Sequence, residues 1–138
     1  MVLIAVLAAL LAGHRTQLPR VESSPPPATV SSSQSSTRMA LSSFCRIDIC
    51  VDYASPWGRR VPVVYIVPGE VLTVRLGFAP TSVAATLLTA LNRRGRAQVL
   101  RPGRVLAWRV PGPGVLLVSA TGSGGDVSYV VRLTGIVR

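Results

Sequence analysis

Lysine is absent from this chain of 138 residues, and histidine, cysteine and acidic residues are scarce. The single histidine, His14, lies in a Ser/Pro-rich stretch, which excludes acid–base or triad chemistry centred on histidine in the folded part. Two cysteines without a nearby histidine form only half of a zinc site. We therefore expect a protein that is not an enzyme and has no catalytic residue, metal or cofactor.

The acidic residues do not form a convincing catalytic pair. Hydrolysis by paired carboxylates needs two acids that converge in a cleft. Asp48 and Asp52 share one face of a predicted strand, but they would lie about 13 Å apart along it. The Gly-rich segment 122–125 lacks the lysine and the following helix of a phosphate-binding loop, so we interpret it as a hairpin turn.

All fifteen basic residues are arginine, and the net charge is +10. The complete absence of lysine indicates the codon bias of a GC-rich genome rather than selection for nucleic-acid binding, which usually employs both residues. The charge nevertheless attracts anionic surfaces in a salt-dependent way. We expect no nucleic-acid partner, because no recognition helix or aromatic platform is evident.

The N-terminal part divides into two segments. Residues 2–13 form an unbroken apolar run, too short to span a bilayer comfortably, so we interpret residues 1–13 as a signal peptide or membrane anchor segment. No basic residue precedes the run, which a start codon assigned too far downstream would explain. Residues 14–43 contain nine serines and three consecutive prolines, a composition typical of a disordered linker.

From residue 44 to 138, short apolar segments alternate with Gly/Pro turns. This pattern predicts an all-β fold, a small antiparallel β-sandwich of immunoglobulin-like size with seven or eight strands, and a small barrel is the second candidate. Segment 81–91 also has a helical apolar stripe, but its all-β surroundings favour a strand. The predicted strands are 46–53, 61–67, 70–77, 81–91, 97–101, 104–110, 114–121 and 126–137, and we expect the later ones to form a meander.

The two cysteines leave several arrangements open. On one straight strand, Cys45 and Cys50 would lie about 16 Å apart and point to opposite faces. A disulfide needs Cα atoms within about 7 Å. Either the chain bends sharply after Phe44 and the two are bonded, or they are unpaired, or they pair between molecules.

Arginines gather in the predicted turns. Arg93, Arg94 and Arg96 occupy one turn, which a meander would place near Pro111, and Arg101 and Arg104 flank the next, which it would place near Gly122. Trp57 is followed by Arg59 and Arg60, and an aromatic beside guanidinium groups can hold a sugar, a phosphate or a lipid head group. The alternative is a buried Trp57 that closes one end of the sandwich under solvated arginines. The candidate contacts for an anionic ligand are Trp57, Arg59, Arg60, Arg93, Arg94 and Arg96.

The segments AWRVPGPGVLLVSAT and GGDVSYVVRL resemble parts of uncharacterised secreted or lipoprotein-type β-sandwich proteins of GC-rich actinobacteria. The likeness covers roughly residues 61–137 and implies an exported domain without implying an activity. Such lipoproteins carry a cysteine where this chain has His14, so lipidation by that route is not inferred.

Together these features predict a secreted or envelope-anchored β-sandwich that is structural or a binding module. Its expected partners are an anionic envelope polymer, lipid head groups or an envelope protein. The alternatives are an accessory subunit that pairs with a larger envelope protein and, least favoured, an envelope hydrolase.

Overall fold

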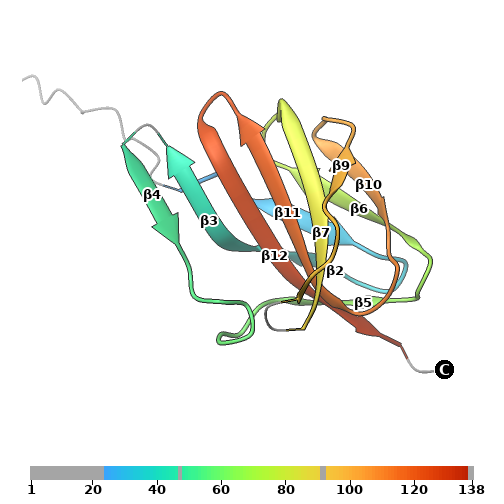
Figure 1. Ribbon diagram of the computed structural model, residues 1–138. Coiled ribbons are helices and arrows are strands. Elements are labelled where there is room, and N and C mark those ends of the chain that lie inside the picture. The colour runs from blue at the N-terminus through green and yellow to red at the C-terminus, as the bar shows by residue number, and fades with distance from the viewer. Residues whose placement is uncertain (1–23, 47, 91–92, 137–138) are drawn as a thin grey trace, which may run out of the picture.

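The computed structural model describes residues 24–46, 48–90 and 93–136, and the regular structure within these ranges is entirely β. Two sheets pack face to face (Figure 1), which confirms the predicted β-sandwich. The small sheet has the order β10–β6–β1–β2, and its members are β1 (Ala28–Ser31), β2 (Ser36–Arg38), β6 (Val71–Leu76) and β10 (Val105–Arg109). In these ranges no helix offers the length and apolar character needed to cross a membrane.

The large sheet has the order β4–β3–β12–β11–β7–β8, with β9 also paired to β7 and β5 to β12. Its members are β3 (Ala40–Arg46), β4 (Ile49–Asp52), β5 (Val63–Ile66), β7 (Ser82–Ala90), β8 (Arg93–Arg94), β9 (Gln98–Leu100), β11 (Gly114–Gly122) and β12 (Gly125–Gly135). β12 pairs with β11 along one side. On its other side it pairs first with β3 and then, in parallel, with β5. The described sheets are not joined edge to edge, so the small-barrel alternative is wrong.

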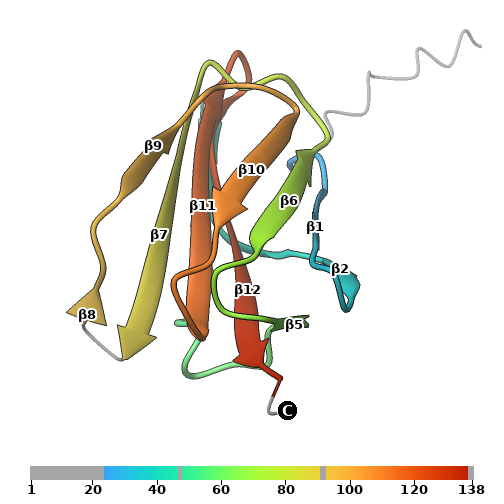
Figure 2. The same cartoon turned by 90° about the vertical axis from the view of Figure 1, so that its right-hand side faces the viewer.

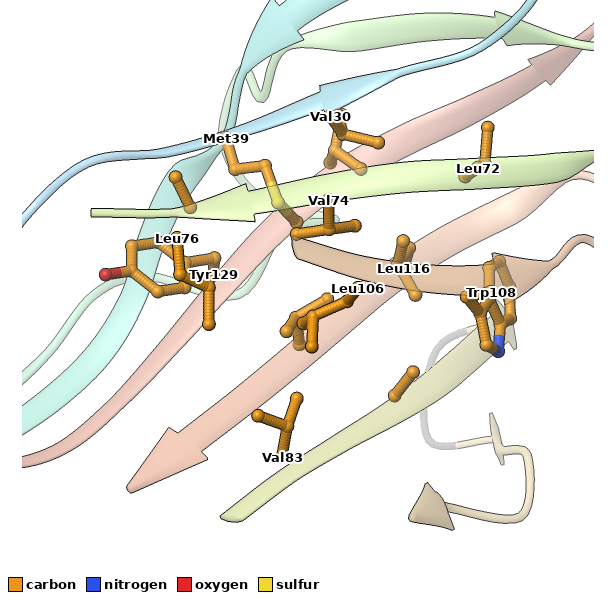
Figure 3. Packing of buried hydrophobic residues seen from close by; sticks show 14 of the residues in the cluster. Val30, Met39, Leu72, Val74, Leu76, Val83, Leu106, Trp108, Leu116 and Tyr129 are labelled. Carbon is orange, nitrogen blue, oxygen red and sulfur yellow. The ribbon is translucent and has the colours of Figure 1, made fainter. Parts of the chain in front are cut away.

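The core lies between the sheets and follows from alternation along each strand. Leu72, Val74 and Leu76 of β6 are buried while Val71 and Arg75 are exposed, as a strand with one covered face requires. Figure 3 shows side chains from both sheets meeting in one cluster. The strands predicted from 61 onward are confirmed within a few residues at each end, and segment 81–91 contains a strand, β7. The meander is wrong, because the chain crosses from the large sheet to the small one between β9 and β10.

The linker prediction for residues 14–43 is wrong from residue 28 onward. Ala28 and Val30 of β1 and the neighbouring Met39 are buried, and β1 pairs with both β2 and β6. Thr29 and Ser31, which belong to the hydroxyl-rich run that suggested disorder, alternate with Ala28 and Val30 and lie on the opposite face of β1, where hydroxyl groups are tolerated. The sandwich therefore begins well before residue 44. The predicted leader 1–13, His14 and the start of the predicted linker lie outside the described residues.

The single strand predicted over 46–53 is also wrong, because β3 ends at Arg46 and β4 begins at Ile49. The two strands form a hairpin in which Cys45 lies directly opposite Cys50, and a disulfide joins them across a Cα–Cα distance of 4.1 Å. A hairpin preserves the period-2 pattern on both arms, so alternation alone did not reveal the turn. Ile49 on β4 is 57% exposed.

Tyr129 joins the N-terminal segment to the core. Its ring is buried on β12, and its hydroxyl donates a hydrogen bond of 2.6 Å to the carbonyl oxygen of Pro26. Burial raises the pKa of Tyr129 to about 12, although the positive charge of Arg46 acts to lower it. The phenol is therefore neutral at physiological pH and serves as a hydrogen-bond donor.

The β11–β12 hairpin should depend on Gly125. Its φ is +122°, and a Cβ there would overlap the carbonyl oxygen of Cys45. We expect Gly125→Ala to lower the free energy of unfolding by about 2–4 kcal/mol. Urea denaturation measures this change. Gly124→Ala is the matched control, since a Cβ there meets nothing within 4 Å. Equal stability of the two variants would contradict the assignment.

The disulfide should stabilise the β3–β4 hairpin. Its loop is short, with a sequence separation of five residues, so replacing Cys45 and Cys50 together by Ser should cost about 2 kcal/mol of unfolding free energy. Denaturation of the wild type with and without reductant should reproduce this difference, and reductant should not affect the double variant. An intact mass corresponding to two free thiols in protein isolated without reductant would refute the bond.

The raised pKa of Tyr129 predicts that the stability of the fold depends on pH in the alkaline range. Because its folded pKa of about 12 lies above the ordinary value of 10.0, its contribution to stability is complete below pH 10 and declines as the pH rises towards 12. The stability advantage of the wild type over Tyr129→Phe should therefore shrink across this interval, as followed by denaturant unfolding at several pH values. An advantage that stays constant would show that the phenol is not buried from solvent.

Candidate functional site

A groove lies along one side of the sandwich, between the edge strand β10 of the small sheet and strands β7 and β9 of the large sheet. We call it the inter-sheet groove, and its volume is about 740 Å³. Its apolar lining residues are Ala85, Leu87, Trp108 and Val110, of which Leu87 is half-buried and the other three are almost completely buried. Both the volume and the apolar lining are typical of small-molecule sites. The polar side chains that line it are Thr89, Arg96, Gln98 and Arg109.

The groove results from the path of the chain between β7 and β10. After β7 the chain turns back, and β8 and β9 pair with β7 itself (Figure 2). It then crosses to the small sheet, where β10 pairs with β6. Gly95 allows the close return, since its N–H donates to the Leu87 carbonyl oxygen at 2.9 Å and a Cβ would lie 2.7 Å from that oxygen. Two segments adjacent in sequence thus belong to different sheets and flank an opening.

Trp108 connects the groove with the core. It is 5% exposed and belongs to the core cluster, and it also lines the groove. In Figure 3 its indole lies at one end of the labelled residues, with the ring nitrogen on the side of β7. The indole N–H is a hydrogen-bond donor, so this residue offers both an aromatic surface and a polar contact.

The electrostatics of the groove are one-sided. Arg96 and Arg109 are both exposed, and Nη1 of Arg109 donates to the Gly69 carbonyl oxygen at 2.7 Å, which holds the guanidinium beside the groove. Among the described residues that line the groove there is no carboxylate. An apolar lining with two guanidinium groups can provide hydrophobic contact and charge-assisted hydrogen bonds to an anion.

The predicted arginine turn is only partly in the groove. Arg96 lines it together with Pro111, as the predicted proximity to that turn implied. Arg93 and Arg94 form β8 and pair with β7, so they are strand residues rather than turn residues. Trp108 and Arg109, which also line the groove, were not among the residues predicted from the sequence. The alternation of apolar and polar residues in 104–110 placed both on a strand, but only the strand order shows that this strand borders an opening.

Trp57, Arg59 and Arg60 lie elsewhere. Trp57 is half-buried against Val115 and Val130 on the outer face of the large sheet, and the Arg132 guanidinium lies 5.8 Å from its ring centroid. It therefore covers a sheet face and does not close an end of the sandwich. Arg59 donates to the Leu41 carbonyl oxygen and lies 5.4 Å from the ring centroid of Tyr53, whereas Arg60 is exposed. The contacts of Trp57 and Arg59 therefore hold the loop between β4 and β5 against the large sheet.

A second hollow, of about 410 Å³, lies at the end of the sandwich beside the β11–β12 hairpin. Arg104 and the glycines of the hairpin line it together, as expected for Arg104 from the sequence. Its charges are mixed, because Arg46 and Asp126 both contribute, and Nη2 of Arg46 donates to the Ser24 carbonyl oxygen at 3.3 Å. It offers a less defined electrostatic preference than the inter-sheet groove.

Within the described part of the chain, no three His, Cys, Asp or Glu side chains gather closely enough to hold a metal ion. The inter-sheet groove is therefore the candidate site with the clearest chemistry, an apolar lining beside two cations. No protein-family model, curated protein or solved structure matches this chain.

Proposed function

We propose that this protein is a non-catalytic binding module of the cell envelope, whose inter-sheet groove holds an anionic amphipathic ligand. The ligand would combine an aliphatic or aromatic body with a carboxylate or phosphate head. The observation that carries this proposal is the combination of the apolar residues Leu87 and Trp108 with the cations Arg96 and Arg109 in one groove without a lining carboxylate.

The geometry supports this ligand class over a purely apolar or purely ionic one. The groove volume of about 740 Å³ accommodates a medium-length acyl chain or an aromatic ring. Guanidinium groups bind carboxylate and phosphate through paired hydrogen bonds, which adds orientation to the attraction. An amphipathic anion would use both parts of the groove.

Two features support an extracytoplasmic location. The apolar run 2–13 is typical of an export signal or anchor. The Cys45–Cys50 disulfide is independent support, since such bonds persist in oxidising compartments and are rare in the cytosol.

An accessory subunit of a larger envelope protein is the second candidate function. β10 forms one edge of the small sheet, and edge strands can pair with a strand of another chain. A strand added to β10 would cover the groove. A soluble complex with one envelope protein, together with no saturable small-ligand site, would favour this function.

Fluorescence titration tests the ligand-binding proposal. In the variant Trp57→Phe, Trp108 is the remaining tryptophan, so its emission reports on the groove. We expect dodecanoate, below its micelle concentration, to change this emission in a saturable way. Adding Arg96→Ser should weaken binding by roughly tenfold, the effect of losing one charge-assisted hydrogen bond.

Arg60→Ser in the same background is the matched control, because Arg60 is exposed and does not line the groove. It should leave the affinity unchanged. Dodecyltrimethylammonium, which carries the opposite charge on the same chain, should bind far more weakly. Equal binding of the two amphiphiles would refute the electrostatic part of the proposal, and a non-saturable response would refute the site.

A further inference from the structure

The outer face of the small sheet carries positive charge in a regular array. Its strand registers place Val105, Arg75, Thr29 and Arg38 in one row across β10, β6, β1 and β2. Ala107, Thr73, Ser31 and Ser36 form the next row, and Arg109 pairs with Val71 at the far end. Figure 2 shows these four strands as one layer. We call this surface the basic face.

Arginines and valines alternate on the basic face. Val105 is paired with Arg75, and Arg109 is paired with Val71, so each of these cations has an exposed apolar neighbour. Val105 is 55% exposed and Val71 is 47% exposed. Arg75 and Arg38 are two strands apart, which corresponds to about 10 Å between their backbones. Arg38, Arg75 and Arg109 are all exposed.

No carboxylate occupies the face positions of these four strands. Glu70 directly precedes β6, but it is half-buried and its Oε2 accepts a hydrogen bond of 2.5 Å from the Ser33 hydroxyl. Like charges spaced in this way repel one another and attract an extended anionic partner. The basic face therefore has the charge pattern of a docking surface for such a partner.

The exposed valines favour a bilayer over a soluble polyanion. Apolar side chains gain free energy at the boundary between head groups and acyl chains, while neighbouring arginines bind lipid phosphates. A dissolved polyanion would pair with the arginines and leave the valines in water. The length of the chain before β1 is consistent with a nearby bilayer. The apolar run ends at residue 13 and β1 begins at Ala28, so a fully extended chain between them would reach at most about 50 Å. If a membrane holds the apolar run, the domain therefore stays within that distance of its surface.

We propose that the basic face docks the domain on the surface of an anionic lipid bilayer. Arg38, Arg75 and Arg109 bind the phosphates of acidic lipids, and Val71 and Val105 enter the head-group region between them. Arg109 belongs to both this face and the inter-sheet groove, whereas Arg38 and Arg75 do not line the groove, so variants of these two arginines test the basic face alone.

Vesicle binding of the full chain tests the proposal. The readout is the ratio of binding to mixed phosphatidylcholine–phosphatidylglycerol vesicles over binding to pure phosphatidylcholine vesicles, because this ratio cancels the contribution of the apolar run. An arginine near an anionic leaflet contributes roughly a fivefold gain, so Arg38→Ser with Arg75→Ser should lower the ratio by about 25-fold. The ratio should also fall with added salt.

The matched control is Arg60→Ser with Arg93→Ser, which removes the same charge from two exposed positions outside the basic face. It should retain most of the anionic preference. Both double variants should keep the wild-type thermal unfolding, because all four side chains are exposed. Equal losses in the two variants would show that net charge alone drives binding, and a wild-type ratio near one would show that there is no preference. Either result would overturn the proposal.

Val71→Ser with Val105→Ser separates a bilayer from a soluble polymer. We expect this variant to bind anionic vesicles several-fold more weakly and soluble polyphosphate as well as the wild type does. Unchanged vesicle binding, together with tight binding of polyphosphate, would identify an anionic polymer as the partner and overturn the bilayer proposal. Failure of dodecanoate to bind the groove would leave these vesicle results unaffected.

Discussion

The pairing of β12 is the constraint on which the rest of the structure depends. Its buried side chains Val127, Tyr129, Val131 and Leu133 contribute to the core along its whole length, and its backbone is paired on both sides. One partner, β11, is local. The other side is shared by an antiparallel strand, β3, and a parallel strand, β5, which requires the intervening chain to pass over the sheet. Trp57 packs on the outer face of the large sheet as part of that passage.

The inter-sheet groove and the basic face both follow from where β10 joins the small sheet. Because β10 pairs with β6 and not with β9, its inward side borders an opening and its outward side extends the face of β6. Trp108 therefore lines the groove while Val105 and Ala107 face solvent. One edge strand supplies residues to two surfaces of different chemistry, an apolar groove beside cations and a flat array of arginines.

Alternation along single strands was predictable from the sequence, and the order of the strands was not. Segment 70–77 was predicted to be a strand, and the structure buries its alternate residues Leu72, Val74 and Leu76. For β1, the serines concealed the pattern, because Ala28, Val30 and Met39 are few and separated by hydroxyl residues. The hairpin at Cys45 and Cys50 was one of several open arrangements, since both arms of a hairpin keep the same period.

The same limit applies to the candidate site. Arg96 was identified from charge clustering in a predicted turn. The roles of Arg38, Trp108 and Arg109 could not be recognised in this way, because they follow from strand neighbours that are distant in sequence. Arg75 lay in a segment correctly predicted to be a strand, but its row partner Arg38 lay in a segment predicted to be a linker. Local periodicity contains no information on which strands become neighbours.

The disulfide lies at the free edge of the large sheet, where β4 is the last strand. A shift of β4 by one residue along β3 would carry Cys50 away from Cys45 and reverse which side chains face inward. The covalent bond therefore fixes the register of an edge strand that is paired on one side only. Loss of the bond would let β4 detach and would leave the edge of β3 open to a strand from a second molecule, so oxidation of these two thiols protects the protein from edge-to-edge aggregation.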